Sequence, residues 1–214
     1  MEQNDWDDVW LKYHAVNVKK VRMYFKTFGF SSVPKDASII DIGCGSGAAL
    51  RMLKEQGYTR LKGLEPEKKL FAEQTDGLIE QGDCLDLGGV KERYDAVLIL
   101  GVLHHLKTFD EIKLALRNVK KVLKPGGRFY SVEQWKNIVR TVAMTLVRDT
   151  PVGLLSPMLR MERKLLELER KELGHWLEVE TDATKYAEEI GLKVIFAKKD
   201  IRYRYLVFEN SKTA

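Results

Sequence analysis

Residues 39–50 read IIDIGCGSGAAL. An apolar run ends in an acid, three glycines alternate with small residues, and an apolar helical pattern follows. This order predicts a buried strand, a tight turn and the start of a helix. Glycine permits sharp turns and has no Cβ to hinder a ligand, while a helix N-terminus presents free N–H groups. The stretch therefore predicts a ligand-binding loop.

The loop is compatible with two kinds of cofactor. A Gly-x-Gly-x-x-Ala spacing from Gly43 satisfies the loose dinucleotide fingerprint, and Glu65 follows at a distance suited to a ribose contact. Gly47 instead completes a Gly-x-Gly-x-Gly spacing. Asp41 places a carboxylate where a pyrophosphate would be unwelcome and where a ligand with a cationic portion is favoured.

Composition sets the broad class of the protein. The 214 residues suffice for one domain with a full core, and 44% hydrophobic with 31% charged residues is typical of a globular protein. The net charge of +5 permits an anionic partner without requiring one. With only Cys44 and Cys84, no disulfide framework is expected. We expect a cytoplasmic protein, because the N-terminus lacks a secretory signal and the longest apolar runs are too short to span a bilayer.

Apolar runs alternate with helical periodicity between residues 38 and 133. This alternation predicts an open parallel sheet covered by helices on both faces, with ligands bound beyond the carboxyl ends of the strands. That edge is expected to contain Asp41 to Gly47, Glu65, Asp83 and Gly101 to His105. We expect strands at 38–42, 61–64, 79–84 (with its exit loop), 94–101 and 128–133, and helices at 48–56, 67–73 and 109–123, the last stopped by a turn at 124–127.

The flanking stretches have a different character. Residues 1–37 predict an N-terminal helical cover, from which Tyr13 or His14 could reach a ligand. Residues 134–180 are too long for a plain connection, and we expect a helical insert that forms a wall of the substrate pocket. Thr181 or Asp182 is expected to cap a helix that ends at Gly191. Residues 192–198 and 203–208 then predict an antiparallel terminal hairpin, and nothing indicates a second domain within 1–214.

The ordered pattern resembles the class I S-adenosylmethionine-dependent methyltransferases, and in layout the small-molecule enzymes of ubiquinone and menaquinone biosynthesis. The likeness covers residues 38–133 well and the terminal hairpin in outline. It implies an α/β fold, a Rossmann-like three-layer sandwich with a mostly parallel seven-stranded sheet and an antiparallel C-terminal hairpin strand. It also implies S-adenosylmethionine as cofactor and S-adenosylhomocysteine as product.

The same resemblance implies a role for each residue of the edge. Asp41 would face the ammonium of the methionine portion, and Glu65 would accept both ribose hydroxyls. Asp83 would accept from the adenine amino group. The remaining implied cofactor contacts are Gly43, Cys44, Gly45, Gly47, Pro66, Cys84, Leu100, Gly101 and, from the cover, Tyr13.

Two histidines follow the central strand, where the methyl group is expected. His105 is the first candidate for a general base and His104 the second, because imidazole titrates near neutral pH. Both could instead brace the loop by hydrogen bonding. No cluster has metal-ligand spacing, so no metal site is expected.

The acceptor stays open between two kinds of molecule. A small molecule is favoured, and a tRNA or other RNA is the enzymatic alternative because basic residues could bind phosphates. Interleaved acids such as Glu162 and Glu167 favour paired surface charges instead. A cofactor-binding scaffold without activity is the alternative from another class, and the oligomeric state is not predicted. The basic residues are Arg140, Arg148, Arg160, Arg163, Lys164, Arg202 and Arg204.

Overall fold

The computed structural model describes residues 18–71, 77–156, 159–160, 163–164, 167 and 170–211. Seven strands form one sheet within these residues. They are β1 (Ser38–Ile42), β2 (Arg60–Glu65), β3 (Ile79–Gln81), β4 (Tyr94–Leu100), β5 (Leu123–Gln134), β6 (Leu192–Lys199) and β7 (Tyr203–Asn210).

The helices alternate with these strands. Residues 18–28 are helical and precede the first strand. The described α-helices that follow are α2 (Ala48–Glu55), α3 (Phe109–Val122), α4 (Ile138–Asp149) and α6 (Arg170–Glu189), joined by short 3-10 helices η1 (Phe30–Ser32), η2 (Lys68–Leu70), η3 (Leu103–His105) and η4 (Pro151–Leu154).

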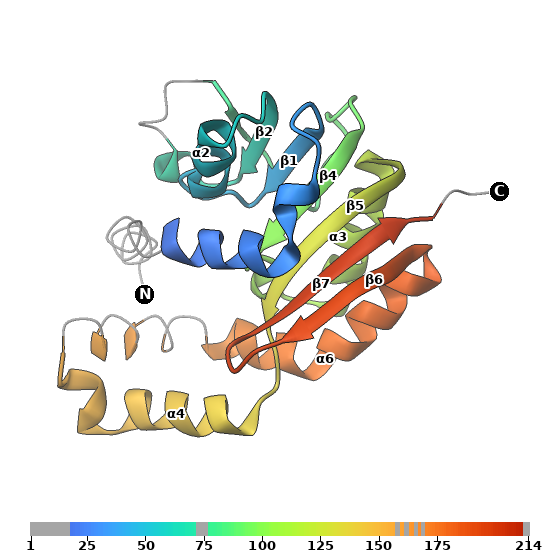
Figure 1. The fold of residues 1–214 in the computed structure, drawn as a ribbon. Coiled ribbons are helices and arrows are strands. Elements are labelled where there is room, and N and C mark those ends of the chain that lie inside the picture. The colour runs from blue at the N-terminus through green and yellow to red at the C-terminus, as the bar shows by residue number, and fades with distance from the viewer. Residues whose placement is uncertain are drawn as a thin grey trace.

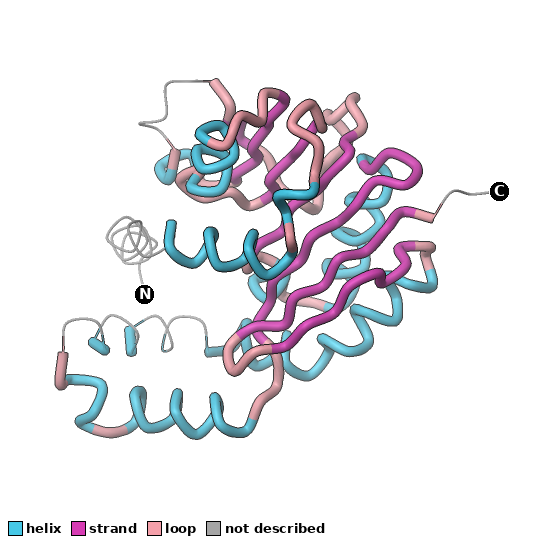
Figure 2. Tube along the Cα trace, in the orientation of Figure 1, coloured by secondary structure: helices cyan, strands magenta, loops and turns pink. Residues whose placement is uncertain are grey.

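The strand order across the sheet is β3-β2-β1-β4-β5-β7-β6 (Figure 1). The first five strands pair in parallel, whereas β7 pairs antiparallel with both β5 and β6. Figure 2 shows β5, β7 and β6 side by side along the longest part of the sheet. The expected α/β fold with an antiparallel terminal hairpin is thus confirmed.

Two hydrophobic clusters cover opposite faces of the sheet. One joins α3 and α6 to β4 and β5, and the other joins α2 and residues 18–28 to β1 and β4. Strand β1 is buried along its whole length, which explains the apolar Ile39, Ile40 and Ile42, and it also buries the polar Ser38 and Asp41. Residues 18–28 also place Tyr24 edge-on against Tyr203 and Tyr205 of β7, with ring centroids 5.3 and 6.0 Å away. This part of the expected cover therefore packs on the sheet.

A polar cluster fixes the amino ends of three strands. One carboxylate oxygen of Asp95 accepts hydrogen bonds from the backbone N–H and hydroxyl of Ser38, at 2.8 and 2.7 Å, and lies 2.7 Å from Lys124 Nζ. It ties β1, β4 and β5 together at the edge away from the glycine loop. The Asp95 carboxylate therefore has a structural role.

Three expected boundaries are wrong. Strand β5 begins at Leu123 and not at Arg128. Residues 124–127 loop out of the ladder between the pairs Tyr94–Leu123 and Ala96–Arg128, with Gly126 at a φ of 77°, so the expected turn lies inside the strand and not before it. Residues 68–70 form the 3-10 helix η2, and residues 72–73 of the expected helix, 67–73, lie outside the described part. Helix α6 runs unbroken through Thr181 and Asp182, which therefore do not cap a helix.

The insert leaves the carboxyl end of β5. Helix α4 and η4 extend away from the sheet, and α6 returns along one face (Figure 1). Trp176 Nε1 donates to the Gln134 carbonyl at 2.7 Å, which fastens α6 to the start of the insert. In the described residues, none of the helices combines the length and apolarity needed to cross a membrane.

Candidate functional site

The glycine loop joins β1 to α2 through a set of positive backbone angles. Gly43, Gly45 and Gly47 have φ values of 72°, 54° and 78°, a region that favours glycine. The N–H groups of Gly43 and Cys44 both donate to the Leu64 carbonyl, at 2.8 and 3.1 Å. The loop is thereby anchored to the end of the neighbouring strand β2.

The two outer glycines are tightly enclosed, whereas the middle one is open. A Cβ at Gly43 would lie 2.5 Å from Val102 Cγ2, and one at Gly47 would lie 2.7 Å from Ile79 Cδ1. A Cβ at Gly45 would meet no described atom within 4 Å. The loop therefore packs on the protein at both ends and presents bare backbone at Gly45.

This difference predicts unequal stability losses. Gly45→Ala incurs the backbone strain of a positive φ, about 1–2 kcal/mol. Gly43→Ala adds an overlap with the stiff side chain of Val102, which costs about 1–3 kcal/mol more. We expect urea unfolding to show a clearly lower midpoint for Gly43→Ala than for Gly45→Ala. Equal urea midpoints for the two variants would show that the Val102 side chain moves aside without a measurable loss of stability.

Two carboxylates are buried next to the loop. Asp41 in β1 is 3% exposed and Glu65 at the end of β2 is 6% exposed. Glu65 Oε2 accepts from the N–H of Gly45 at 2.8 Å, and Oε1 accepts from the N–H of Glu67 at 3.1 Å. Burial raises the pKa of Glu65 despite these hydrogen bonds.

The pKa of Asp41 is the more strongly shifted of the two. Burial, assisted by the negative charge of Glu65, raises the pKa of Asp41 to about 7. The Cys44 thiol shares this environment, and burial together with Asp41 and Glu65 raises its pKa as well. Such a site disfavours further negative charge and favours a ligand with a cationic group.

The residues after β3 are less open to a ligand than expected. Asp83 is half-buried, and its Oδ1 accepts from the N–H of Leu85 at 2.8 Å, which closes a local turn. The side chain of Cys84 packs in the hydrophobic core, and its carbonyl accepts from Asn118 Nδ2 at 3.1 Å. Pro66 is exposed after β2, and its carbonyl accepts from Gln81 Nε2 at 3.0 Å.

The end of β4 completes the edge. Leu100 is half-buried, and Gly101, with φ of 80°, donates its N–H to the Val132 carbonyl at 2.8 Å. His104 is 4% exposed, whereas His105 is half-buried. Burial raises the pKa of Glu65 and the nearby His105 ring opposes this rise, so the two side chains are electrostatically coupled. Tyr13 lies outside the described residues.

Sequence reasoning missed one residue of this edge. Glu133, near the end of β5, is 4% exposed and accepts from the N–H groups of Val102 and Leu103 at 2.8 and 2.7 Å. Its other oxygen lies 2.8 Å from His104 Nδ1. An acid at the carboxyl end of a buried strand was the available signal, the same one that singled out Glu65.

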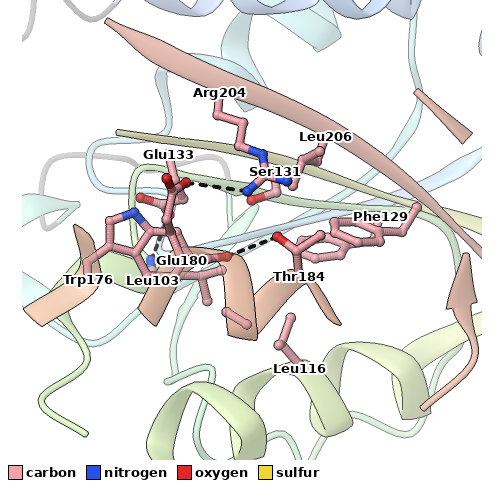
Figure 3. Close-up of a pocket in the computed structure, with 12 residues that line it drawn as sticks. Leu103, Leu116, Phe129, Ser131, Glu133, Trp176, Glu180, Thr184, Arg204 and Leu206 are labelled. Carbon is pink, nitrogen blue, oxygen red and sulfur yellow. Dashed lines mark hydrogen bonds and ion pairs between the residues drawn. The ribbon is translucent and has the colours of Figure 1, made fainter. Parts of the chain in front are cut away.

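A small cavity lies behind this edge (Figure 3). It is lined by Glu133, Glu180, Trp176, Arg204 and neighbouring core side chains of α3, α6, β5 and β7. Its volume is about 20 Å³, room for about one water molecule. It includes neither Asp41 nor Glu65 and is separate from the glycine-loop edge.

Comparison with known proteins identifies the family. A family described as "Methyltransferase domain" matches residues 40–131, which contain the glycine loop, both buried carboxylates and strand β4. This part of the chain matches a methyltransferase domain, as the resemblance to the class I S-adenosylmethionine-dependent methyltransferases implied. The resemblance inferred from the sequence is confirmed at this level, and the ubiquinone-like subtype is not specifically shown.

Relatives of the chain are named for different acceptors. The tRNA (carboxymethyluridine(34)-5-O)-methyltransferase of Arabidopsis thaliana is 30% identical over 104 residues, which cover 49% of this chain and 25% of that protein. The dTDP-3-amino-3,4,6-trideoxy-alpha-D-glucopyranose N,N-dimethyltransferase of Streptomyces venezuelae is 30% identical over 110 residues, which cover 49% of this chain and 45% of that protein. The matches span less than half of either relative.

The fold likeness extends further along the methyltransferase. The magnesium protoporphyrin IX methyltransferase of Synechocystis PCC 6803, solved with bound S-adenosylhomocysteine, superposes with a TM-score of 0.60 at 19% identity. That superposition covers 91% of this chain and 83% of the other. The likeness in fold therefore extends beyond residues 40–131.

Proposed function

We propose that the chain transfers the methyl group of S-adenosylmethionine to a nucleophilic O, N or C atom of a small-molecule acceptor. The observation that carries this proposal is the burial of Asp41 and Glu65 together beside the open backbone of Gly45. An ammonium group would offset the burial and the repulsion from Glu65 that together raise the pKa of Asp41. A carboxylate at Glu65 suits two ribose hydroxyls, because two donors meet two acceptor oxygens.

The other edge residues have narrower proposed roles. Asp83 would use its second oxygen for the adenine amino group, since Oδ1 already accepts from Leu85. Cys84 would contribute its backbone N–H, because its side chain lies in the core. Leu100 and Gly101 would offer backbone groups to the methionine portion. Pro66 and Cys44 would border the site through contact alone.

The chemistry needs few catalytic groups. The sulfonium of the bound cofactor supplies an electrophilic methyl group for in-line displacement. The protein contributes alignment of the acceptor and exclusion of water. We propose that the insert, residues 134–180, and the N-terminal cover, residues 1–37, perform these tasks. A base is needed only where the nucleophile must lose a proton, and His105 is the candidate.

Charge pairing favours a small acceptor over RNA. Arg163 Nε lies 3.0 Å from Glu167 Oε1, and Arg204 lies 3.4 Å from Glu180. Arg148 forms a 2.5 Å pair with Asp149. Cations already paired with carboxylates contribute less to a phosphate-binding surface, whose affinity depends on neutralising several phosphates. Similarity to tRNA-modifying relatives keeps RNA as the second candidate.

Substitution of His105 tests its role as the base. We expect His105→Ala to lower kcat by about 100-fold, the lower range for general base catalysis, with little change in cofactor affinity. The acid limb of the pH–rate profile should flatten, because deprotonated imidazole is then no longer required. An unchanged kcat and an unchanged pH profile would remove His105 from the chemistry.

Labelled cofactor identifies the acceptor class. The protein is incubated with methyl-labelled S-adenosylmethionine and, in parallel, with a small-metabolite extract or with total tRNA. We expect label in a low-mass product shifted by one methyl group. Label confined to tRNA would establish the second candidate. Cofactor binding without labelling of either fraction would support a scaffold that has lost activity.

A further inference from the structure

The carboxylate of Glu133 has three donors around it. Both backbone N–H groups at the start of η3, from Val102 and Leu103, donate to Oε1, at 2.8 and 2.7 Å. Oε2 lies 2.8 Å from Nδ1 of the His104 ring. All these partners lie 29 to 31 residues earlier in the chain, so Glu133 joins β5 to the loop after β4.

This arrangement specifies which nitrogen of the His104 ring carries the proton. An ionised carboxylate only accepts hydrogen bonds, so the contact at Oε2 requires a proton on Nδ1. In a neutral imidazole the proton is then absent from Nε2. Glu133 and His104 are both 4% exposed, and a buried contact of this kind is costly to leave unmade.

The loop held by Glu133 forms part of the cofactor edge. Val102 is the side chain against which Gly43 packs, within 2.5 Å of the place a Cβ would occupy. The His104 and His105 rings lie with their centroids 4.1 Å apart, and His105 is coupled to Glu65. The position of Glu133 is therefore transmitted by direct contacts to both the glycine loop and the candidate base.

We infer that Glu133 is a positioning residue for methyl transfer. It fixes the backbone at Val102 and Leu103 and holds His104 as the Nδ1–H tautomer, which in turn sets the orientation of His105. His104 acts as the brace in this arrangement and His105 as the group nearest the chemistry. The kinetic part of this inference rests on the proposed function, whereas the tautomer is a property of the protein alone.

The tautomer is measured by long-range ¹H–¹⁵N correlation of the histidine rings at a pH where His104 is neutral. We expect the wild type to show a protonated Nδ1 and an unprotonated Nε2. In Glu133→Gln the carbonyl oxygen can still accept from the loop, and the amide NH₂ faces Nδ1. The ring should then switch to the Nε2–H tautomer.

Glu180→Gln is the matched control. Glu180 is also buried and lines the same cavity (Figure 3), but its carboxylate pairs with Arg204 of β7 and accepts from the N–H of Lys136 in the insert. Its substitution should leave the His104 signals unchanged. Glu133→Gln should also lower kcat by about 10- to 100-fold through a misplaced loop, with a smaller change in the KM for S-adenosylmethionine.

Two results would overturn the inference. One is an Nε2–H tautomer in the wild-type protein, which needs no variant and no activity. The other is a folded Glu133→Gln protein with the wild-type tautomer and wild-type kcat. Failure of the wild type to bind S-adenosylmethionine would instead reject the proposed function, and the ring signals would still decide whether Glu133 sets the tautomer.

Discussion

Glu65→Ala is expected to weaken S-adenosylmethionine binding by at least about 100-fold. Two hydrogen bonds to a charged carboxylate contribute about 3–6 kcal/mol, and each 1.4 kcal/mol is about tenfold in affinity. The substitution also releases the N–H of Gly45, which Glu65 holds at 2.8 Å, so the loop loses an anchor. Isothermal titration calorimetry of the variant against the wild type measures the loss.

Glu80→Ala is the control for Glu65→Ala. Glu80 is a glutamate of the neighbouring strand β3, its side chain is 62% exposed, and it pairs with Lys62 at 2.8 Å. Its removal should leave cofactor affinity within about twofold, since exposed ion pairs contribute little. Wild-type affinity in a folded Glu65→Ala protein would contradict the assignment of Glu65 to the ribose.

Asp41 is expected to make cofactor binding depend on pH. Its pKa of about 7 means that the free protein holds a neutral carboxyl below neutrality. Binding of an ammonium group favours the ionised form, so protonation competes with the ligand. Affinity should rise as pH increases from about 5 to about 8, by up to about tenfold per pH unit below the pKa. Asp41→Asn should bind weakly and with little pH dependence.

The same residue is expected to affect stability in the opposite direction. An ordinary aspartate titrates near pH 4 in the unfolded chain, so between about pH 4 and 7 only the folded state holds the proton. The contribution of Asp41 to the free energy of unfolding therefore falls as the pH rises through this window. The pKa differs by about three between the folded and unfolded states, and at about 1.4 kcal/mol per pH unit the fall is about 4 kcal/mol.

Denaturant unfolding without ligand checks this effect. Asp41→Asn removes the ionisable group, so the variant should match the wild type near about pH 4 and exceed its stability near about pH 8. Using the difference between the two proteins cancels the other titrating groups. A difference that does not change with pH would show that the Asp41 carboxyl is not perturbed.

The sequence predicted the fold where the local pattern and the tertiary contacts agree. All five residues of strand β1 are buried, and Ile39, Ile40 and Ile42 mark the strand in the sequence because both of its faces are covered. The same logic located Glu65 and the central strand β4. At these positions the residue pattern is compatible with only one local structure.

The errors occur where tertiary packing outweighs local preference. Thr181 and Asp182 are favourable caps, yet α6 continues through them, because Leu173, Trp176, Ala183 and Ala187 present one apolar stripe to the core. Residues 124–127 have turn composition and loop out of the pairing with β4, but Leu123 before them already pairs with Tyr94, so β5 begins earlier than expected.

Glu133 was missed for a related reason. Its partners lie 29 to 31 residues away, and no local spacing reports a contact that the pairing of β4 with β5 creates. The methyl acceptor is equally hard to predict from the sequence, because we propose that the insert and the N-terminal cover select it. The matched family region, residues 40–131, includes neither.

Cofactor selectivity of the unmodified protein tests the central claim most directly. Calorimetric titration at about pH 8 should show saturable binding of S-adenosylmethionine and S-adenosylhomocysteine, and no binding of NAD⁺, whose pyrophosphate would meet the charge of Asp41. Binding of NAD⁺ with no heat from S-adenosylmethionine would contradict the account, because the glycine loop would then hold a dinucleotide.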